Sequence, residues 1–123
     1  MTTTSSLEQD LSQLAIWDRS QLLSRVGNRQ DRIELLIEMY LDDAHNQLTK
    51  LKKAILALDY PIVAATSHRI KGSAANLGAE KVRALCHHLE EAAQNGDSDS
   101  IEFFWPLFKT AHQEFEQELK SAK

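Results

Sequence analysis

A histidine followed three positions later by a lysine is the part of this sequence best suited to covalent chemistry. His68 and Lys71 lie in a helical pattern, and side chains three positions apart meet on a helix surface. Neutral imidazole is a nucleophile near pH 7 and forms covalent intermediates in proteins. A neighbouring ammonium group could stabilise the oxygens of a phosphoryl group on the ring. The pair therefore favours phosphoryl chemistry at His68, with Lys71 stabilising the added charge.

The side chains around His68 are small for a helix surface. At about 100° per residue, the core-facing arc of the helix should hold Ile62, Thr66, Ile70, Ser73 and Leu77. His68 falls almost opposite, and its neighbours there form a small-residue face of Ala64, Ala65, Gly72 and Ala75. Exposed helix surfaces normally favour long charged side chains, and glycine inside a helix costs about 1 kcal/mol relative to alanine. We therefore predict that this face admits another protein to His68.

The sequence lacks the features needed to take phosphate from ATP. The chain has only 4 glycines, and none of them forms a glycine-rich phosphate-binding motif. Close to His68 in sequence there is also no carboxylate cluster for Mg²⁺. We therefore expect a phosphocarrier without ATP-dependent kinase activity and without a cofactor or metal of its own. The Mg²⁺ and most of the catalysis should come from the partner protein.

Amphipathic helices of regular spacing should position His68. Apolar residues recur at three- and four-residue steps, and Asp, Pro and Gly mark the boundaries. These signals predict a short helix over about 18–26, then longer helices over about 31–59, 61–76, 79–94 and from 98 or 99 onward. Pro106 should kink the last helix or mark its true beginning. We predict an all-α, antiparallel up-down four-helix bundle with a short extra N-terminal helix, formed by residues 16–121 after a mostly flexible tail over 1–15.

Composition restricts the protein class further. The chain has 123 residues, enough for one compact domain, and a formal net charge of -4, so no nucleic-acid partner is expected. There is no signal peptide pattern and no run of about 20 apolar residues to span a membrane. Cys86 is the only cysteine, which fits a reducing compartment and is typical of a small core residue. We expect a monomer in the cytoplasm.

The residues around His68 also resemble a known signature. The run from Ala65 to Ala79, ATSHRIKGSAANLGA, is similar to the motif of histidine-containing phosphotransfer (HPt) domains in bacterial two-component phosphorelays. The similarity continues at Val82, Leu85, Cys86, Leu89 and Glu90. More loosely, it extends over about residues 17–120. Ile70 departs from the pattern, which commonly has leucine there, but this apolar swap conserves volume.

The resemblance implies a function. In an HPt domain, His68 would accept a phosphoryl group from an aspartyl phosphate on a response-regulator receiver domain, usually through Nε2, and pass it reversibly to another receiver. Lys71 would be the neighbouring cation and Gly72 the gap that admits the receiver. The upstream partner would be a hybrid sensor histidine kinase. The chain looks like a stand-alone HPt protein, although a domain excised from a hybrid kinase would look similar.

Two other function classes stay open on sequence alone. The first is a helical adaptor that docks on a receiver or kinase domain without exchanging phosphate, using the same small-residue face. The second is a metal-dependent enzyme, for which the i, i+4 pairs His87–Glu91 and His112–Glu116 are the available ligand spacings. The acidic pairs Asp42–Asp43 and Glu90–Glu91 are expected to be solvated, although either could rim a docking surface.

Overall fold

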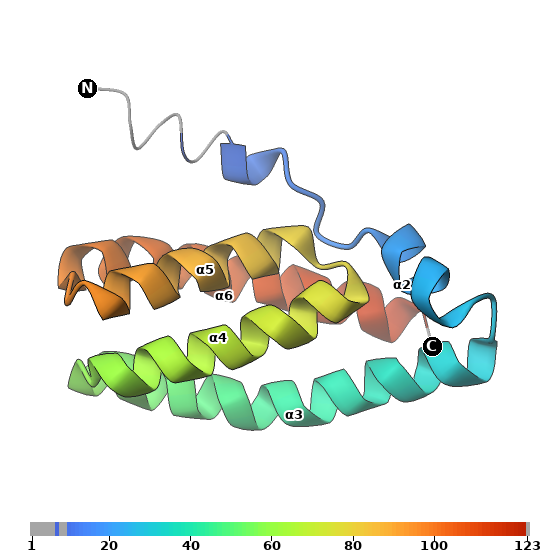
Figure 1. Cartoon of the computed structure of the whole chain (residues 1–123), viewed down its shortest axis with the longest axis horizontal. Coiled ribbons are helices and arrows are strands. Elements are labelled where there is room, and N and C mark those ends of the chain that lie inside the picture. Colours follow the sequence, from blue (N-terminus) through green and yellow to red (C-terminus); the bar gives the residue numbers. More distant parts are fainter. Residues whose placement is uncertain (1–6, 8–9, 123) are drawn as a thin grey trace.

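The regular elements of the protein are all helices in the computed structural model, which describes residue 7 and residues 10–122. The helices are α2 (Arg19–Val26), α3 (Gln30–Ala57), α4 (Tyr60–Leu77), α5 (Glu80–Gln94) and α6 (Ser98–Ser121) (Figure 1). Helix α3 packs against α4, α4 against α5 and α5 against α6, and α6 returns to α3. Helix α2 contacts α3 and α4. The predicted all-α bundle with a short extra N-terminal helix is confirmed.

Aspartates begin three of these helices. The carboxylates of Asp18, Asp59 and Asp97 accept backbone N–H groups in the first turns of α2, α4 and α6. Asp59 was predicted to end the long helix, but α3 stops earlier because Leu58 adopts a left-handed conformation (φ 51°). Asp59 is thereby released to cap α4. Pro106 lies inside α6, so it does not mark the beginning of that helix.

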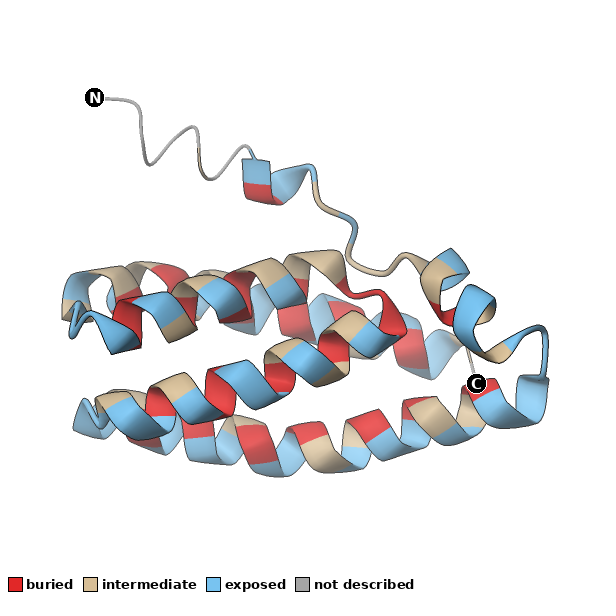
Figure 2. Ribbon diagram, viewed as in Figure 1, coloured by how far each residue is buried: buried red, intermediate tan, exposed pale blue. Residues whose placement is uncertain are grey.

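The core lies between the four long helices and is mostly aliphatic and aromatic. Figure 2 shows buried residues along the faces that α3, α4 and α5 turn toward their neighbours. The largest fully buried apolar side chains are Leu22, Ile33, Ile37, Leu51, Val63, Leu85, Leu89, Ile101, Phe108, Phe115 and Leu119. Cys86 is also buried, as predicted, and burial raises the pKa of its thiol far above the ordinary value.

The C-terminal end of α4 is held by residues that precede α3. Trp17 Nε1–H donates to the carbonyl of Leu77 at 2.7 Å. Arg25 Nη1 donates to the carbonyls of Ala75 at 2.8 Å and Asn76 at 2.6 Å. Helix ends leave carbonyls without intrahelical partners. These side chains therefore form a clamp, Trp17 and Arg25, that satisfies the last carbonyls of α4.

Gly78 makes the close approach at this end possible. It caps α4 in the left-handed region (φ 88°), and its carbonyl accepts the N–H of Asp18 at 2.8 Å. A Cβ atom at this position would collide with the backbone oxygen of Asp18. Only glycine combines that conformation with such close backbone packing.

The segment before α2 contacts the bundle within its described part. Leu11 is buried in the core, and the carbonyl of Ala15 accepts the N–H of Lys81 at 3.0 Å. Bundle contacts thus begin before residue 16, the predicted domain boundary. The predicted flexibility of the tail falls mainly on residues 1–6 and 8–9, which lie outside the described residues.

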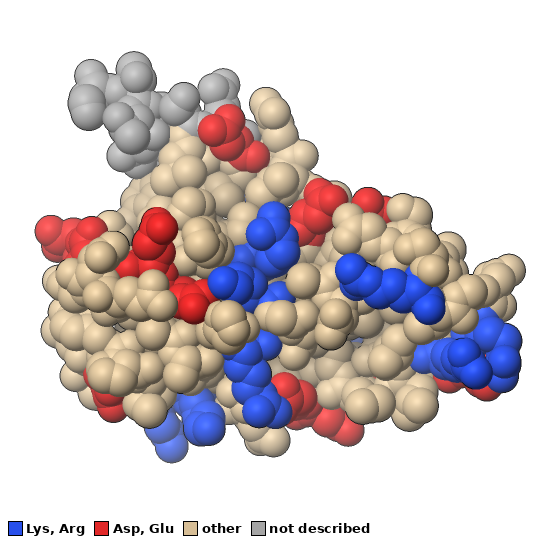
Figure 3. Space-filling model, viewed as in Figure 1, with Lys and Arg blue, Asp and Glu red and all other residues tan. Residues whose placement is uncertain are grey.

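The surface carries charges of both signs. On the face shown in Figure 3, Lys and Arg side chains lie near Asp and Glu side chains, and most of the surface is neither. Within the described residues, every helix is too short or too polar to cross a lipid bilayer.

Candidate functional site

His68 stands on the outside of α4, as predicted. Its side chain is 68% exposed, while Ser67 on one side of it in the sequence is buried. The capping carboxylate of Asp59 and the Trp17–Arg25 clamp define the two ends of α4. This helix therefore presents an accessible imidazole from a backbone that is fixed at both ends.

Glu90 of α5 binds both residues singled out on α4. Its Oε2 lies 2.9 Å from His68 Nδ1, and its Oε1 accepts Lys71 Nζ at 2.6 Å. The Glu90 side chain is 13% exposed and that of Lys71 is 24% exposed, so this ion pair is shielded from much of the solvent. One carboxylate thus links α4 to α5 and joins the histidine to the lysine.

The ionisation of Glu90 determines which histidine nitrogen is reactive. Burial alone would raise the pKa of Glu90, but hydrogen bonds and charges from Lys71 and His68 outweigh it and lower the pKa. An ionised carboxylate only accepts hydrogen bonds, so the proton of the neutral imidazole lies on Nδ1. The lone pair of Nε2 then points away from Glu90, and no hydrogen-bond partner of Nε2 is found among the described residues. The arrangement orients a nucleophilic nitrogen toward solvent.

The small-residue face surrounds His68 with open space. Ala65 and Gly72 are exposed, whereas Ala64 and Ala75 are half-buried. A Cβ atom added at Gly72 would meet nothing within 4 Å. Packing inside the chain therefore does not explain a glycine here, which supports a role toward a partner.

The buried arc of α4 differs from the predicted one. Ile62 is 43% exposed and Ser73 is half-buried, although both were predicted to face the core. The residues that do face it are Val63, Thr66, Ser67, Ile70, Ala74 and Leu77. Helix α4 packs against both α3 and α5, so its buried arc is broader and rotated relative to the predicted stripe. The assignment of His68 to the opposite face is unaffected.

A groove between α3 and α4 adjoins the His68 face. Arg69, next to His68, donates to Asp43 of α3 at 2.8 Å. The groove has a volume of about 400 Å³ and is lined by Leu36, Met39, Tyr40, Asp43, Arg69, Ser73, Asn76 and Leu77. Met39 is 58% exposed and nearby Leu35 is 56% exposed. Exposed apolar side chains of α3 are therefore available for docking on the Arg69 side of α4.

The other histidines differ from His68 in their surroundings. His112, which sequence spacing offered only as a metal ligand with Glu116, is buried, and its Nε2 lies 2.8 Å from the Tyr40 hydroxyl. His88 is half-buried and stacks on Phe104, with ring centroids 4.5 Å apart. Within the described residues, no group of three His, Cys, Asp or Glu side chains could hold a metal ion. The metal-enzyme hypothesis thus gains no support.

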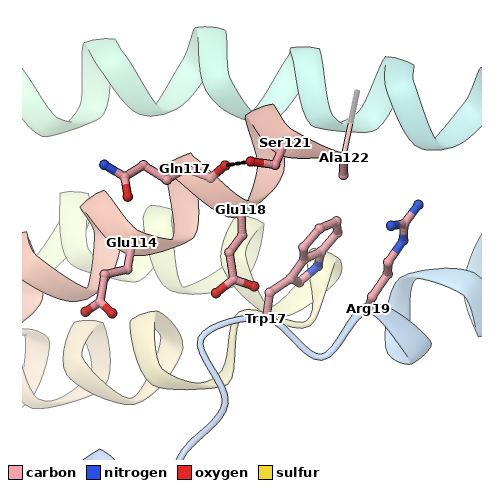
Figure 4. A pocket seen from close by; sticks show the side chains of 7 residues that line it. All are labelled: Trp17, Arg19, Glu114, Gln117, Glu118, Ser121 and Ala122. Carbon is pink, nitrogen blue, oxygen red and sulfur yellow. Dashed lines mark hydrogen bonds between the residues drawn. The ribbon is translucent and has the colours of Figure 1, made fainter.

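A separate surface hollow of about 610 Å³ lies near the C-terminal end of α6. Figure 4 shows Trp17 next to Glu118 of α6, with Glu114 and Arg19 at opposite sides of the hollow. None of its lining residues belongs to the His68 site or to the small-residue face. Its size alone gives it no chemistry.

Glu90 is the site residue whose role the sequence did not reveal: it matched the signature, but it was expected to be solvated and was not paired with His68 or Lys71. Its neighbour Glu91 is 61% exposed, as expected for a solvated pair, but Glu90 turns inward to His68 and Lys71. The apolar stripe of α5 is the sequence signal that could have shown that Glu90 faces the bundle. Glu90 directly follows buried Leu89, which places it at the edge of the packed face. The carboxylate near His68 that local sequence lacks is supplied from the next helix.

Comparisons with known proteins add independent findings. A family model described as "Hpt domain" matches residues 35–121. The phosphorelay intermediate protein rdeA of Dictyostelium discoideum is 29% identical over 108 residues, 88% of this chain, and the chain spans only 39% of that relative's length. Histidine-containing phosphotransfer protein B of Pseudomonas aeruginosa has a TM-score of 0.67 and 28% identity, covering 85% of this chain and 95% of its own. Maize histidine-containing phosphotransfer protein ZmHP2 has a TM-score of 0.70 over 87% of this chain and 79% of its own, and its 20% identity supports the fold alone.

Proposed function

This chain belongs to the Hpt domain family, and we propose that it is a phosphorelay intermediate in two-component signalling that carries the phosphoryl group on His68. The observation that carries the proposal is the exposed imidazole of His68, anchored through Nδ1 to Glu90. Proteins of this family are phosphoryl carriers rather than kinases. We propose that this chain, too, takes no phosphate from ATP.

The reaction follows from the orientation of the ring. Nε2 of His68 attacks the phosphorus of an aspartyl phosphate on a receiver domain, the N–P bond forms, and the acyl O–P bond breaks to release the aspartate carboxylate. Phosphoryl transfer depends mainly on positioning and on charge stabilisation. Glu90 supplies the positioning through Nδ1, and Lys71 lies where an ammonium group can approach the transferred oxygens. The reverse sequence returns the phosphoryl group to a receiver.

The small-residue face gives the receiver its access. In this proposal Ala64, Ala65, Gly72 and Ala75 form the surface on which the receiver sits while its aspartate reaches Nε2. The Mg²⁺ needed for transfer is bound by the receiver. We further propose that the upstream donor is the receiver of a hybrid sensor histidine kinase, and that the chain acts as a cytoplasmic monomer without nucleic acid.

Transfer to point variants tests the proposal. A receiver domain is phosphorylated with acetyl phosphate, freed of excess reagent and mixed with the protein, and the label is followed by intact-protein mass spectrometry. Wild type should gain one phosphoryl group and His68→Gln none. The matched control is His87→Gln on α5, whose side chain is 52% exposed, and it should be labelled like wild type. Stable label on His68→Gln would refute the assignment of the site.

The adaptor hypothesis makes a different prediction in the same experiment. The apolar groove with exposed Met39 could bind a receiver without any phosphate exchange. The adaptor would be favoured if the wild-type protein binds the phosphorylated receiver but gains no phosphoryl group. In that case the receiver would lose its phosphate only by hydrolysis.

A further inference from the structure

Arg69 presents a half-occupied guanidinium group beside His68. It directly follows His68 in α4, and its side chain is 60% exposed. Its Nε and Nη2 atoms donate to the two carboxylate oxygens of Asp43 in α3, at 3.3 Å and 2.8 Å. Its Nη1 atom has no hydrogen-bond partner among the described residues. One edge of the guanidinium is thus held by the protein, and another is left to solvent.

The contact with Asp43 fixes the direction of the open edge. A guanidinium group is planar and carries its five N–H donors in a rigid fork. Because Asp43 binds the edge formed by Nε and Nη2, the edge formed by Nη1 and Nη2 points away from Asp43. Two parallel N–H groups on one edge match the two oxygens of a carboxylate. The ion pair therefore leaves Arg69 oriented to bind a second anionic group.

A receiver that reaches His68 must also cover Arg69. Interfaces of standard size bury about 800 Å² on each partner, far more than one side chain supplies. Arg69 is the next residue after His68, and it also lines the groove between α3 and α4 that includes exposed Met39. Docking of a receiver therefore removes water from the open edge of the guanidinium.

The removal of this water is unfavourable unless the receiver replaces it. Charged donors that are buried without an acceptor lose the hydrogen bonds that they made to water. A site that holds such donors rejects partners that lack the matching acceptor. Asp43 does not provide it, because both of its oxygens bind the other edge of Arg69. The missing acceptor has to come from the partner.

We propose that Arg69 is a specificity-determining residue, which selects receiver domains that carry a carboxylate where they cover its open edge. The inference rests on the proposed function of His68 and adds a requirement for its partner. Consecutive residues of a helix point in directions about 100° apart, so Arg69 acts on the docked receiver surface and not on the phosphoryl group. Its contribution is therefore the same before and during transfer.

Arg69→Gln tests the selection, because it removes the charged fork from an exposed side chain. Receiver domains phosphorylated with acetyl phosphate are screened, and the one that labels wild type fastest is used in excess to measure the transfer rate against receiver concentration. Arg69→Gln should raise the half-saturating concentration about tenfold and leave the maximal rate within about twofold of wild type. An unchanged half-saturating concentration, or an effect on the maximal rate alone, would overturn the inference.

Arg69→Lys separates the hydrogen-bonding fork from simple attraction of charge. It keeps the positive charge but loses the planar pair of donors, so the half-saturating concentration should still rise about threefold or more. Binding as tight as that of wild type would show that charge alone is sufficient and would overturn the proposal. This variant also tests the inference if Arg69→Gln fails to fold.

Arg29→Gln is the matched control. The Arg29 side chain is 58% exposed, and its Nε and Nη2 atoms bind Asp31 at 3.3 Å and 3.2 Å, in the same arrangement as Arg69 and Asp43. Arg29 does not line the groove. The control should leave both transfer constants unchanged. Equal losses in Arg29→Gln and Arg69→Gln would point to net charge rather than to a contact, and would contradict the proposal.

Charge reversal identifies the group on the receiver. Arg69→Glu should weaken docking further than Arg69→Gln, because it places two carboxylates against each other. The acidic residues around the phosphorylated aspartate of the receiver are then replaced by arginine one at a time, and one replacement should recover about tenfold of the lost affinity for Arg69→Glu. Failure of every replacement would overturn a carboxylate as the partner of Arg69. Absence of any label on wild type would instead reject the proposed function itself, so the two failures are distinguishable.

Discussion

Replacing Gly72 with alanine should make the protein more stable and slower in phosphoryl transfer. Gly72 lies inside α4, and glycine in a helix interior costs about 1 kcal/mol relative to alanine. The added methyl group would meet nothing within 4 Å, so no steric term opposes the gain. The free energy of unfolding should therefore rise by about 0.5–1 kcal/mol. For a domain of this size that corresponds to an increase in Tm of about 2–6 °C.

The functional cost of the same substitution should appear only with a partner. The Cβ atom would project into the space through which, in the proposed function, a receiver reaches His68. Transfer from an acetyl-phosphate-labelled receiver should slow several-fold for Gly72→Ala and be almost abolished for Gly72→Gln, a good helix former with a long side chain. Urea denaturation followed by circular dichroism gives the stability, and quenched-flow labelling gives the rate. Unchanged or lower stability of Gly72→Ala would refute the packing argument, and wild-type transfer by Gly72→Gln would refute the access argument.

Two further predictions concern stability. Gly78→Ala should lower the free energy of unfolding, measured by urea denaturation, by about 2 kcal/mol or more. The substitution places an alanine in a left-handed conformation against the backbone of Asp18. A variant as stable as wild type would contradict this explanation of the turn. The second prediction is that His112 makes the free energy of unfolding depend on pH. Burial is the largest influence on the pKa of His112 and lowers it, and it outweighs the opposing influence of Glu116. The unfolded chain therefore binds a proton at His112 more readily than the folded chain. Its contribution is therefore complete above the ordinary histidine pKa of about 6.5 and is lost as pH falls below it. Urea midpoints at pH 7.5 and 5.5 should differ more for wild type than for His112→Gln, and equal differences would rule out this role.

Much of the helical architecture could be predicted because its determinants are local. The capping aspartates and Gly27 and Gly78 lie next to the boundaries that they set, and the apolar stripes repeat within each helix. The rotation of the buried arc of α4 could not be predicted, because it depends on how α3 and α5 divide the surface of α4 between them. Alanine and serine occupy part of the buried arc, and both residue types occur in buried and in exposed positions. The hydrophobic pattern of α4 therefore does not show where the buried arc ends.

In the candidate site, too, residues on one helix could be predicted and contacts between helices could not. His68, Lys71 and Gly72 could be singled out together because they share one turn of one helix. Glu90 lies 22 residues from His68 in the sequence, and its contact with the imidazole exists only once α4 and α5 pack together. Tyr40 and His112 are 72 residues apart and join α3 to α6 for the same reason. A spacing rule written for one helix cannot detect such pairs.

The clamp at the end of α4 bears on how the protein should be dissected. The family-matched region begins at residue 35, after both Trp17 and Arg25. A fragment trimmed to that region would keep every residue of the reactive surface yet lose the side-chain donors to the carbonyls of Ala75, Asn76 and Leu77, of which only Ala75 keeps another donor, the N–H of Gly78. The helix that carries His68 would then fray from its C-terminal end. Grafts, fusions and binding assays should therefore retain the chain from Leu11 onward, since the support of the helix that carries His68 begins well upstream of the region that defines the family.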